Sequence, residues 1–280
     1  MNGTLYIVAT PIGNLGDISY RAVETLATVE RIYAEDTRNS IRLLQHYSIN
    51  KPLHALHDHN EERKINEIAL LLAEGKDLAL ISDAGTPLIS DPGYKLVREL
   101  ASQGANIAPI PGASAAIAAL SIAGLATDKF TFEGFLSAKK QARLQQLKAL
   151  KKQSHTQIYY ESSHRIVACV DAMIEVMGGE RQVVLARELT KLYEQVFRGS
   201  LRELADWLQA DSNHQKGEFV LILAGFAGDN SPTAALDNEQ LLTILLEDLP
   251  VKQAATLAAK LSGMSKNEAY KRALQIGRQL

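Results

Sequence analysis

Cysteine is nearly absent from this chain, since Cys169 is the only one among 280 residues. A single thiol excludes a disulfide framework and cysteine-cluster metal sites, and it fits a protein of the reducing cytoplasm. Long apolar runs are also absent, and none approaches the roughly 20 residues that span a bilayer. No hydrophobic signal segment precedes the first strand pattern. We therefore expect a soluble, cytoplasmic protein with no membrane partner.

An excess of charge of one sign is missing too, because 30 lysines and arginines stand against 32 acidic residues, which gives a net charge of −2. Any surface for a polyanion must therefore be a local patch. One candidate is the segment 137–154, which has basic residues and no acidic ones. The other is 251–280, with six bases against Glu268. Both patterns suit phosphate contacts, although a solvated helix face would give a pattern similar to the first.

Two familiar kinds of ligand site find little support in the sequence. His57 and His59 resemble a metal-binding pair, but no third ligand follows at a diagnostic spacing. The turn Gly13–Asp17 follows the first strand pattern, yet it lacks the G-x-G-x-x-G spacing, and no Walker lysine loop is present. We expect no bound metal and no conventional dinucleotide site.

What the chain does contain is a regular alternation of strand and helix over residues 1–123, which predicts a mostly parallel sheet with helices on both faces. The strand patterns lie at Leu5–Ala9, Arg31–Ala34, Leu53–His57, Asp77–Ile81 and Ile107–Ile110. The helical patterns lie at Ser19–Val29, Thr37–His46, Glu62–Glu74, Tyr94–Gln103 and Ser114–Ala123.

Residues 124–227 follow a different pattern, because some strands succeed one another without a helix between them. This pattern predicts a second α/β domain with a mixed sheet. Its strand patterns are Phe130–Phe135, Gln157–Tyr160, Gln182–Ala186, Tyr193–Phe197 and Phe219–Ala224, and its helical patterns are Lys139–Lys152, His164–Met177 and Leu201–Leu208. After the linker Gly228–Pro232, residues 232–280 predict a small helical module of helix-turn-helix type, with Ser265 capping its second helix.

The loop Ser82–Gly93 is the most informative segment, because it follows a buried strand and holds two prolines and two glycines in twelve residues. Ligands bind at the carboxyl ends of strands in open α/β sheets, so this loop is a candidate ligand site. Similar strand-end positions are expected for 34–38, 111–116, 160–165 and 186–191. Helix capping, tight packing or structural ion pairs would explain each of these segments equally well when it is taken alone.

Taken together, these segments resemble the tetrapyrrole-methylase superfamily of S-adenosylmethionine-dependent methyltransferases. Within it they are similar to the branch that methylates a cytidine ribose 2′-hydroxyl in small-subunit (16S) ribosomal RNA. The similarity runs from Thr4 to about Phe226, through VATPIGNLGDIS, AEDTR, HDHNE, SDAGTPLISDPG, PGASAAIAAL, FEGFLSAK, YESSHR, ARELTKLYE and GEFVLIL. Ser163 departs from the family pattern, which has proline there. The C-terminal region resembles the helix-turn-helix appended to that branch.

The resemblance implies two α/β domains of the tetrapyrrole-methylase type, S-adenosylmethionine held in the cleft between them, and a homodimer. It implies cofactor contacts from residues of both domains, namely Pro11, Asp83, Ala84, Gly85, Thr86, Ile89, Ser114, Ala115, Tyr160, Leu189 and Glu218. Small-subunit ribosomal RNA is the implied partner. The expected RNA contacts are Arg38, Lys139, Lys140, Arg143 and Arg165, together with the basic C-terminal module.

A ribose hydroxyl is a poor nucleophile, so we expect a positioned base or a polarising cation beside it. Placement at strand ends makes Glu188, with Arg187 and Lys191, the first catalytic candidate, and Asp36 the second. Two alternatives stay open, namely a tetrapyrrole or corrin C-methyltransferase and a DNA-binding regulator that uses only the C-terminal module. The first would need neither basic segment, and the second would lose its activity on truncation at Gly228.

Overall fold

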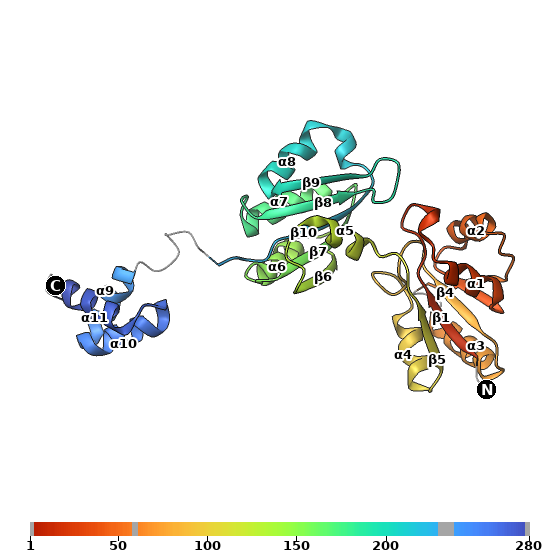
Figure 1. Cartoon of the computed structure of the whole chain (residues 1–280), viewed down its shortest axis with the longest axis horizontal. Helices are drawn as coiled ribbons and strands as arrows, with labels where there is room; N and C mark the ends of the chain where they lie inside the picture. Colours follow the sequence, from red (N-terminus) through yellow and green to blue (C-terminus); the bar gives the residue numbers. More distant parts are fainter. Residues whose placement is uncertain (1–2, 58–60, 229–237, 278–280) are drawn as a thin grey trace. The chain divides into compact units, whose positions relative to one another are not determined.

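The computed structural model of the chain describes residues 3–57, 61–228 and 238–277. These residues divide into two units, Met1–Gly225 and Phe226–Leu280. The first unit contains two five-stranded sheets with helices packed on them (Figure 1). Within the described ranges, no helix has the length and apolar character needed to cross a bilayer.

All strands of the first sheet are parallel, in the order β3-β2-β4-β1-β5. The strands are β1 (Thr4–Val8), β2 (Arg31–Ala34), β3 (Leu53–Ala55), β4 (Leu78–Ile81) and β5 (Asn106–Ile110). The helices beside them are α1 (Tyr20–Thr28), α2 (Thr37–His46), α3 (Glu61–Ala73) and α4 (Tyr94–Ser102). Buried side chains alternate along β4, since Ala79 and Ile81 pack with α1 and α2, whereas Leu78 and Leu80 pack with α3 and α4. The prediction of a parallel sheet covered on both faces is confirmed.

Local signals set the ends of these elements. β2 and α2 begin and end at the residues expected from the sequence, and the other elements shift by one or two residues at an end. The Ser19 side chain accepts a hydrogen bond from the Ala22 N–H, which caps α1 as expected. Gly75 adopts a φ of 81° directly after α3, a conformation that glycine reaches without a steric penalty.

The second sheet is mixed, with the order β6-β7-β10-β8-β9. Its strands are β6 (Phe130–Phe135), β7 (Thr156–Ser162), β8 (Gln182–Arg187), β9 (Gln195–Ser200) and β10 (Glu218–Leu223). Only the pair β6 and β7 is parallel, and the remaining pairs are antiparallel. Helices α6 (Lys140–Leu150), α7 (Ile166–Met177) and α8 (Leu201–Ala210) pack against one face. Cys169 lies in that core and is fully buried, which excludes it as an accessible thiol.

Helix α5 (Ala115–Ala123) covers the other face of the second sheet. It follows β5 directly in the chain, and the sequence places it in the first region. Its alanines Ala116 and Ala119 nevertheless pack with Val184 of β8 and Ile222 of β10. Small side chains allow the helix to lie close to the sheet. Because α5 links the two sheets, its N-terminus lies where their strand ends meet.

The described residues of the second unit form a bundle of three helices, α9 (Asn238–Asp248), α10 (Val251–Ser262) and α11 (Lys266–Ile276). Leu242, Ala258 and Ala269 are fully buried in its core. The Ser265 hydroxyl accepts a hydrogen bond of 3.2 Å from the Glu268 N–H, which is the expected cap of α11. The sequence pattern missed α9. The parts of the expected module at 232–237 and 278–280, with Arg278, lie outside the described residues.

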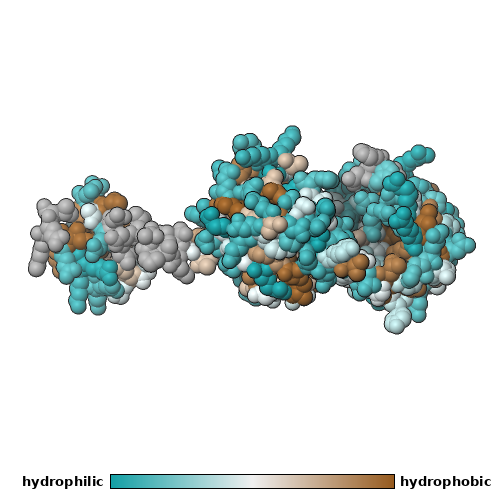
Figure 2. Space-filling model, turned by 90° about the horizontal axis from the view of Figure 1, so that it is seen from above, coloured by the Kyte–Doolittle hydropathy of each residue, from teal (hydrophilic) through white to brown (hydrophobic). Residues whose placement is uncertain are grey.

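Hydrophilic residues cover most of the face of the first unit seen in Figure 2, and hydrophobic residues break that surface in small groups. Leu192 is the most exposed large apolar residue in the described strand-end loops, with 88% of its surface accessible to solvent. No broad apolar surface dominates this face of the described residues.

Candidate active site

The loop after β4 is held in place by backbone contacts with the turn after β1. Thr10 and Gly85 exchange two backbone hydrogen bonds, with N–O distances of 2.9 and 3.1 Å. Gly85 has a φ of 82°, and Leu88 and Ser90 also adopt left-handed conformations. Left-handed backbone at non-glycine residues persists only where the surrounding structure enforces it, and such residues cluster at ligand sites.

A cavity of about 380 Å³ opens beside this loop, and we call it the central cavity. Its walls come from the carboxyl ends of β4, β7 and β8, the N-terminus of α5, and the first residues of antiparallel β10. Both sheets therefore contribute to one site. All but one of the residues that the family resemblance implies as cofactor contacts line this cavity. Those that line it are Asp83, Ala84, Gly85, Thr86, Ile89, Ser114, Ala115, Tyr160, Leu189 and Glu218.

Pro11 is the exception, because it lines a neighbouring hollow of about 480 Å³ rather than the central cavity. We call this space the second hollow. Its lining is Thr10, Pro11, Ile12, Gly13, Leu15, Asn39, Arg42, Leu43, Asp83, Ala84, Lys191 and Glu218. The two spaces share Ile12, Asp83, Ala84 and Glu218, so they adjoin along these residues.

Sequence reasoning missed several walls of the central cavity, including Ile12, Phe135 and Val220, and Asp91 lines the cavity as well. Ile12 and Val220 belong to the apolar cluster that α5 makes with the second sheet. The sequence does not show whether an apolar residue lines a cavity or packs in the core. Asp91 belongs to the loop that the sequence singled out, and its polar character was the available signal.

Polar groups in the central cavity are partly buried. Burial raises the pKa of Asp91, although a hydrogen bond with Ser82 acts in the opposite direction. The Tyr160 hydroxyl accepts a hydrogen bond of 3.1 Å from the Ala116 N–H, at the first turn of α5. The cavity thus combines apolar walls with carboxylates, which suits a ligand that carries an apolar ring and positively charged or hydroxyl groups.

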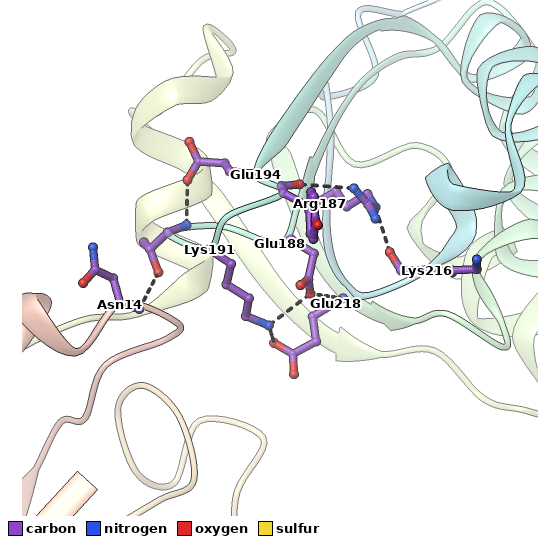
Figure 3. A network of polar contacts seen from close by, with 9 residues as sticks. Asn14, Arg187, Glu188, Lys191, Glu194, Lys216 and Glu218 are labelled. Carbon is purple, nitrogen blue, oxygen red and sulfur yellow. Dashed lines mark hydrogen bonds and ion pairs between the residues drawn. The ribbon is translucent and has the colours of Figure 1, made fainter. Parts of the chain in front are cut away.

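Lys191 stands between two carboxylates beside the central cavity (Figure 3). Its Nζ atom lies 3.0 Å from Glu188 Oε1 and 2.8 Å from Glu218 Oε2. Glu188 Oε1 also accepts the Glu218 N–H at 2.9 Å. Burial acts to lower the pKa of Lys191, but both carboxylates raise it above its ordinary value. Lys191 is therefore a fixed cation, and Glu188 holds it in place.

The loop that carries Lys191 is tied to its surroundings at several points. Glu188 and Thr190 have positive φ values of 51° and 64°. The Thr190 N–H donates to Glu194 Oε2 at 2.6 Å, and the Thr190 hydroxyl accepts from the Asn14 N–H at 3.1 Å (Figure 3). Residues 176 positions apart in the chain are thereby joined, and the loop is fixed against the turn after β1.

The structure does not place Arg187 in either hollow, where a catalytic residue would be expected. Its side chain is 7% exposed and lines neither hollow. Its guanidinium donates to the carbonyl oxygens of Lys216 and Tyr193 and to Gln195 Oε1, at 2.7 to 3.1 Å. These bonds satisfy the buried charge and hold the β8–β9 connection, so Arg187 supports the fold rather than the reacting atoms.

Asp36 also lines neither hollow. Its carboxylate caps α2 and pairs with the Arg38 guanidinium at 2.6 Å, and these hydrogen bonds with Arg38 lower its pKa to about 2. The Asp36 N–H donates to Asp83 Oδ1 at 3.2 Å, and the amide of Asn39 donates to Asp83 Oδ2 at 2.9 Å. Asp36 and Asn39 therefore orient the carboxylate of Asp83, which lines both hollows.

The basic helix offers fewer surface cations than its sequence suggests. Lys139 and Lys140 are exposed, but Arg143 is 5% exposed and donates to the carbonyl oxygens of Ser137 and Ala138. Arg143 lies one turn before the buried Leu147, and this spacing is the signal that would have placed it on the inner face.

Arg165 also differs from the expectation of an RNA contact. Its Nε atom lies 3.1 Å from Oε1 of the fully buried Glu161 carboxylate, and its guanidinium donates to the Leu136 carbonyl oxygen. It neutralises a buried charge, because an unpaired buried carboxylate would be costly. Of the two histidines weighed as metal ligands, His59 lies outside the described residues, and the described part of the chain holds no group of three or more metal-ligating side chains.

The low pKa of Glu188 predicts a pH-dependent effect on stability. Burial raises this pKa, but the Glu218 N–H and Lys191 outweigh burial and keep it below its ordinary value of 4.5. Such a carboxylate stabilises the fold above the unfolded pKa, and this contribution is lost as the pH falls through the folded pKa. We expect Glu188→Gln to lower the free energy of unfolding near pH 7, and the difference from wild type to shrink below about pH 4.5. Urea unfolding across this range measures it, and a difference independent of pH would contradict the expectation.

Comparison with known proteins gives two matches to protein families. The family described as Tetrapyrrole (Corrin/Porphyrin) Methylases matches residues 4–205, and the family described as RsmI C-terminal HTH domain matches residues 232–277. Together these matches cover most of the first unit and the helices α9, α10 and α11 of the second unit.

Curated relatives match over nearly the full chain. The protein named Ribosomal RNA small subunit methyltransferase I of Pseudomonas aeruginosa is 50% identical over 274 residues, which covers 98% of this chain and 97% of the relative. The protein of the same name from Haemophilus influenzae is 49% identical over 271 residues, with 96% of each chain covered. The protein of that name from Synechocystis is 44% identical, with 98% of each chain covered.

Solved structures share the fold of the first unit. A cobalt precorrin-4 methyltransferase superposes with a TM-score of 0.60 at 18% identity, covering 79% of this chain and 94% of the other. A diphthine synthase superposes with a TM-score of 0.61 at 16% identity, covering 80% and 90%. At these identities the similarity concerns the fold alone.

Proposed function

The chain belongs to the tetrapyrrole (corrin/porphyrin) methylase family, and from this premise we propose that it methylates the ribose 2′-hydroxyl of a cytidine in small-subunit (16S) ribosomal RNA. It is an S-adenosylmethionine-dependent methyltransferase that acts on this rRNA. The structural observation that carries the proposal is the central cavity, where strand ends of both sheets enclose a space with apolar walls and carboxylates.

The lining of the central cavity fits S-adenosylmethionine. Ile12, Leu189 and Val220 offer apolar surface for the adenine ring. Asp83 and Glu218 place carboxylates where the ligand's ribose hydroxyls or positive charges can bind. Ser114 and Ala115, at the start of α5, also line the cavity, and the Ala116 N–H in the same turn is bound by the Tyr160 hydroxyl. We propose these residues, with the Asp83–Thr86 loop, Ile89, Ala115 and Tyr160, as the donor site.

S-adenosylmethionine supplies a sulfonium methyl group that is already activated for transfer. The acceptor hydroxyl must lose its proton to a water molecule as it takes up the methyl group, so the chain must align this hydroxyl and stabilise the negative charge that forms on its oxygen. We propose that Lys191 does the last of these, because its ammonium lines the second hollow beside the central cavity. Glu188 is a positioning residue, since its carboxylate holds Lys191 and the Glu218 N–H.

The surfaces proposed for RNA are those that stay exposed. Lys139 and Lys140 lie at the start of α6, and Arg38 is exposed although it pairs with Asp36. We also propose that the C-terminal module binds RNA. The chain would then consist of three domains, at residues 1–123, 124–227 and 232–280. A homodimer in the cytoplasm remains part of the same proposal.

The decisive experiment uses the full chain, labelled S-adenosylmethionine and small ribosomal subunits that lack the modification. We expect label at one ribose 2′-oxygen of a cytidine in the rRNA, mapped by nuclease digestion and mass spectrometry. Subunits that already carry the methyl group are the control and should take up none. Transfer to a base nitrogen or carbon, or to a tetrapyrrole instead of RNA, would overturn the proposal.

Truncation after residue 227 separates this enzyme from a regulator that acts through its C-terminal helices. The residues that line the central cavity all lie between positions 12 and 220. The truncated chain should therefore still bind S-adenosylmethionine by calorimetry while it loses affinity for subunits. The corrin alternative has no comparable support, because the C-terminal match is to a domain described as that of RsmI.

A further inference from the structure

The second hollow adjoins the central cavity, and this continuity limits where the acceptor can enter. Methyl transfer requires the acceptor oxygen to lie in line with the donor's methyl group, at near contact distance. The acceptor must therefore occupy a space that opens onto the central cavity. The second hollow meets this condition, because Ile12, Asp83, Ala84 and Glu218 belong to both linings.

Most charged side chains of the second hollow already have partners. Asp83 accepts hydrogen bonds from the Asp36 N–H and from the side chain of Asn39. Lys191 is shared between Glu188 and Glu218. Arg42 differs from these groups, since within the described ranges its exposed side chain has no hydrogen bond or ion pair to another residue. Among the described residues, Arg42 is the cation of this hollow whose charge no carboxylate balances.

Helix α2 determines where Arg42 lies. Leu44 is buried in the apolar cluster that covers the first sheet, and this packing fixes the rotation of the helix. Asn39 and Arg42 are three positions apart, so they lie on the same side of α2, and both line the second hollow. Arg42 lines only the second hollow, whereas Asp83 and Glu218 lie in the lining shared with the central cavity.

On the basis of the proposed function, we propose that the second hollow receives the target nucleotide of the RNA and that Arg42 binds a phosphate group next to that nucleotide's ribose. A guanidinium presents paired N–H donors that match two phosphate oxygens. An anionic phosphate is repelled by the carboxylates of the shared lining and attracted to Arg42. The ribose is thereby directed toward the shared lining, where its 2′-hydroxyl meets the donor's methyl group beside the Lys191 ammonium that pairs with Glu218.

The test compares Arg42→Ala and Arg42→Lys with wild type in the full chain, using small ribosomal subunits that lack the modification. Arg42→Ala should weaken subunit binding about tenfold and reduce the slope of log affinity against log salt by about one unit, because one phosphate contact is lost. Arg42→Lys should restore the salt slope but only part of the affinity, because lysine keeps the charge without the paired donors. Donor affinity should stay at the wild-type value in both variants.

Lys76→Ala is the matched control, because Lys76 precedes β4 at the opposite edge of the same sheet and pairs with Glu74 on the surface. It should change neither the salt slope nor the subunit affinity. A salt slope for Arg42→Ala equal to that of wild type would overturn the inference even if methylation is unimpaired. Subunit binding without methyl transfer by wild type would instead refute the proposed function, and the salt slope would still decide whether Arg42 contacts phosphate. Absence of any subunit binding by wild type would overturn both.

Discussion

Replacing Lys191 by methionine should lower the single-turnover rate of methyl transfer about 100-fold or more, the usual cost of removing one group that stabilises developing charge. Methionine keeps the length of the side chain and removes the ammonium, which leaves Glu188 and Glu218 facing each other without their shared cation. Donor affinity should change far less, because Lys191 lines the second hollow and is not among the residues that line the central cavity. Rapid-quench assays with saturating donor and excess enzyme measure the rate, and calorimetry measures donor affinity.

Lys216→Ala is a suitable control for Lys191→Met, because Lys216 lies close in the structure but its ammonium bonds to Asn213 and it lines neither hollow (Figure 3). Its rate should match wild type within about threefold. If Lys191→Met retained a rate in that range as well, Lys191 would act only in tying the loop. Lys191→Arg should recover part of the rate, because it keeps a cation between the two carboxylates.

Two further variants of the same experiment separate general-base catalysis from orientation. Asp36→Asn should leave the rate near wild type, since Asp36 lines neither hollow and its carboxylate is bound by Arg38. Glu188→Gln should cost less than Lys191→Met, because glutamine still accepts the Glu218 N–H through its side-chain oxygen. If Glu188→Gln lowered the rate more than Lys191→Met, Glu188 would be a general base and not only a positioning residue.

Gly85→Val should reduce the affinity for S-adenosylmethionine about 10- to 100-fold, because overpacking a closely packed wall costs roughly 1–3 kcal/mol. Gly85 lines the central cavity with a φ of 82°, and a Cβ atom there would lie 3.3 Å from Ile12 Cγ2. A β-branched residue is strained in this conformation, and its methyl groups would press on the wall that Ile12 forms. The loop must then move, and its paired hydrogen bonds with Thr10 would be disturbed.

Gly104→Val separates backbone strain from the effect on the cavity. Gly104 has a φ of 75°, and a Cβ atom there would meet nothing within 4 Å. Both variants should lose stability of about 1–3 kcal/mol from the left-handed conformation. Only Gly85→Val should lose donor affinity, measured by calorimetry at a temperature where both variants are folded. Equal donor affinity in the two variants would show that Gly85 does not shape the donor site.

The sequence alone predicted the elements and their local ends well, because these depend on short-range physics. Strand β4 is buried on both faces, as expected for a sheet covered by helices on both sides, and Ser19 and Ser265 cap their helices through their own hydroxyl groups. The loop 82–93 could be chosen as a ligand site because its position at a strand end follows from the parallel sheet. Helix α9 was not identified within the expected helical module, although its Leu241 and Leu242 are buried.

Charge patterns were a weaker guide, because the position of a charged residue in the sequence does not show which groups will pair with its charge or accept its hydrogen bonds. Arg143, Arg165 and Arg187 read as surface or catalytic cations, yet each side chain is bound to backbone carbonyl oxygens or to a buried carboxylate. Arg42 attracted no attention in the sequence, and the structure places it in the second hollow with no partner among the described residues. Only packing decides which cations remain available.

The sequence by itself determined the strands, the helices and their caps, and it brought together at one sheet edge the loops that carry the chemistry. Tertiary structure decided that α5 packs on the second sheet and that Asn14 meets Thr190 across 176 residues. It also decided that Ile12 and Leu189 share one apolar cluster beside the cavity. The physical reason is that hydrogen bonding and side-chain periodicity act between near neighbours in the chain. The contact between two sheets instead depends on which surfaces fit after both have formed.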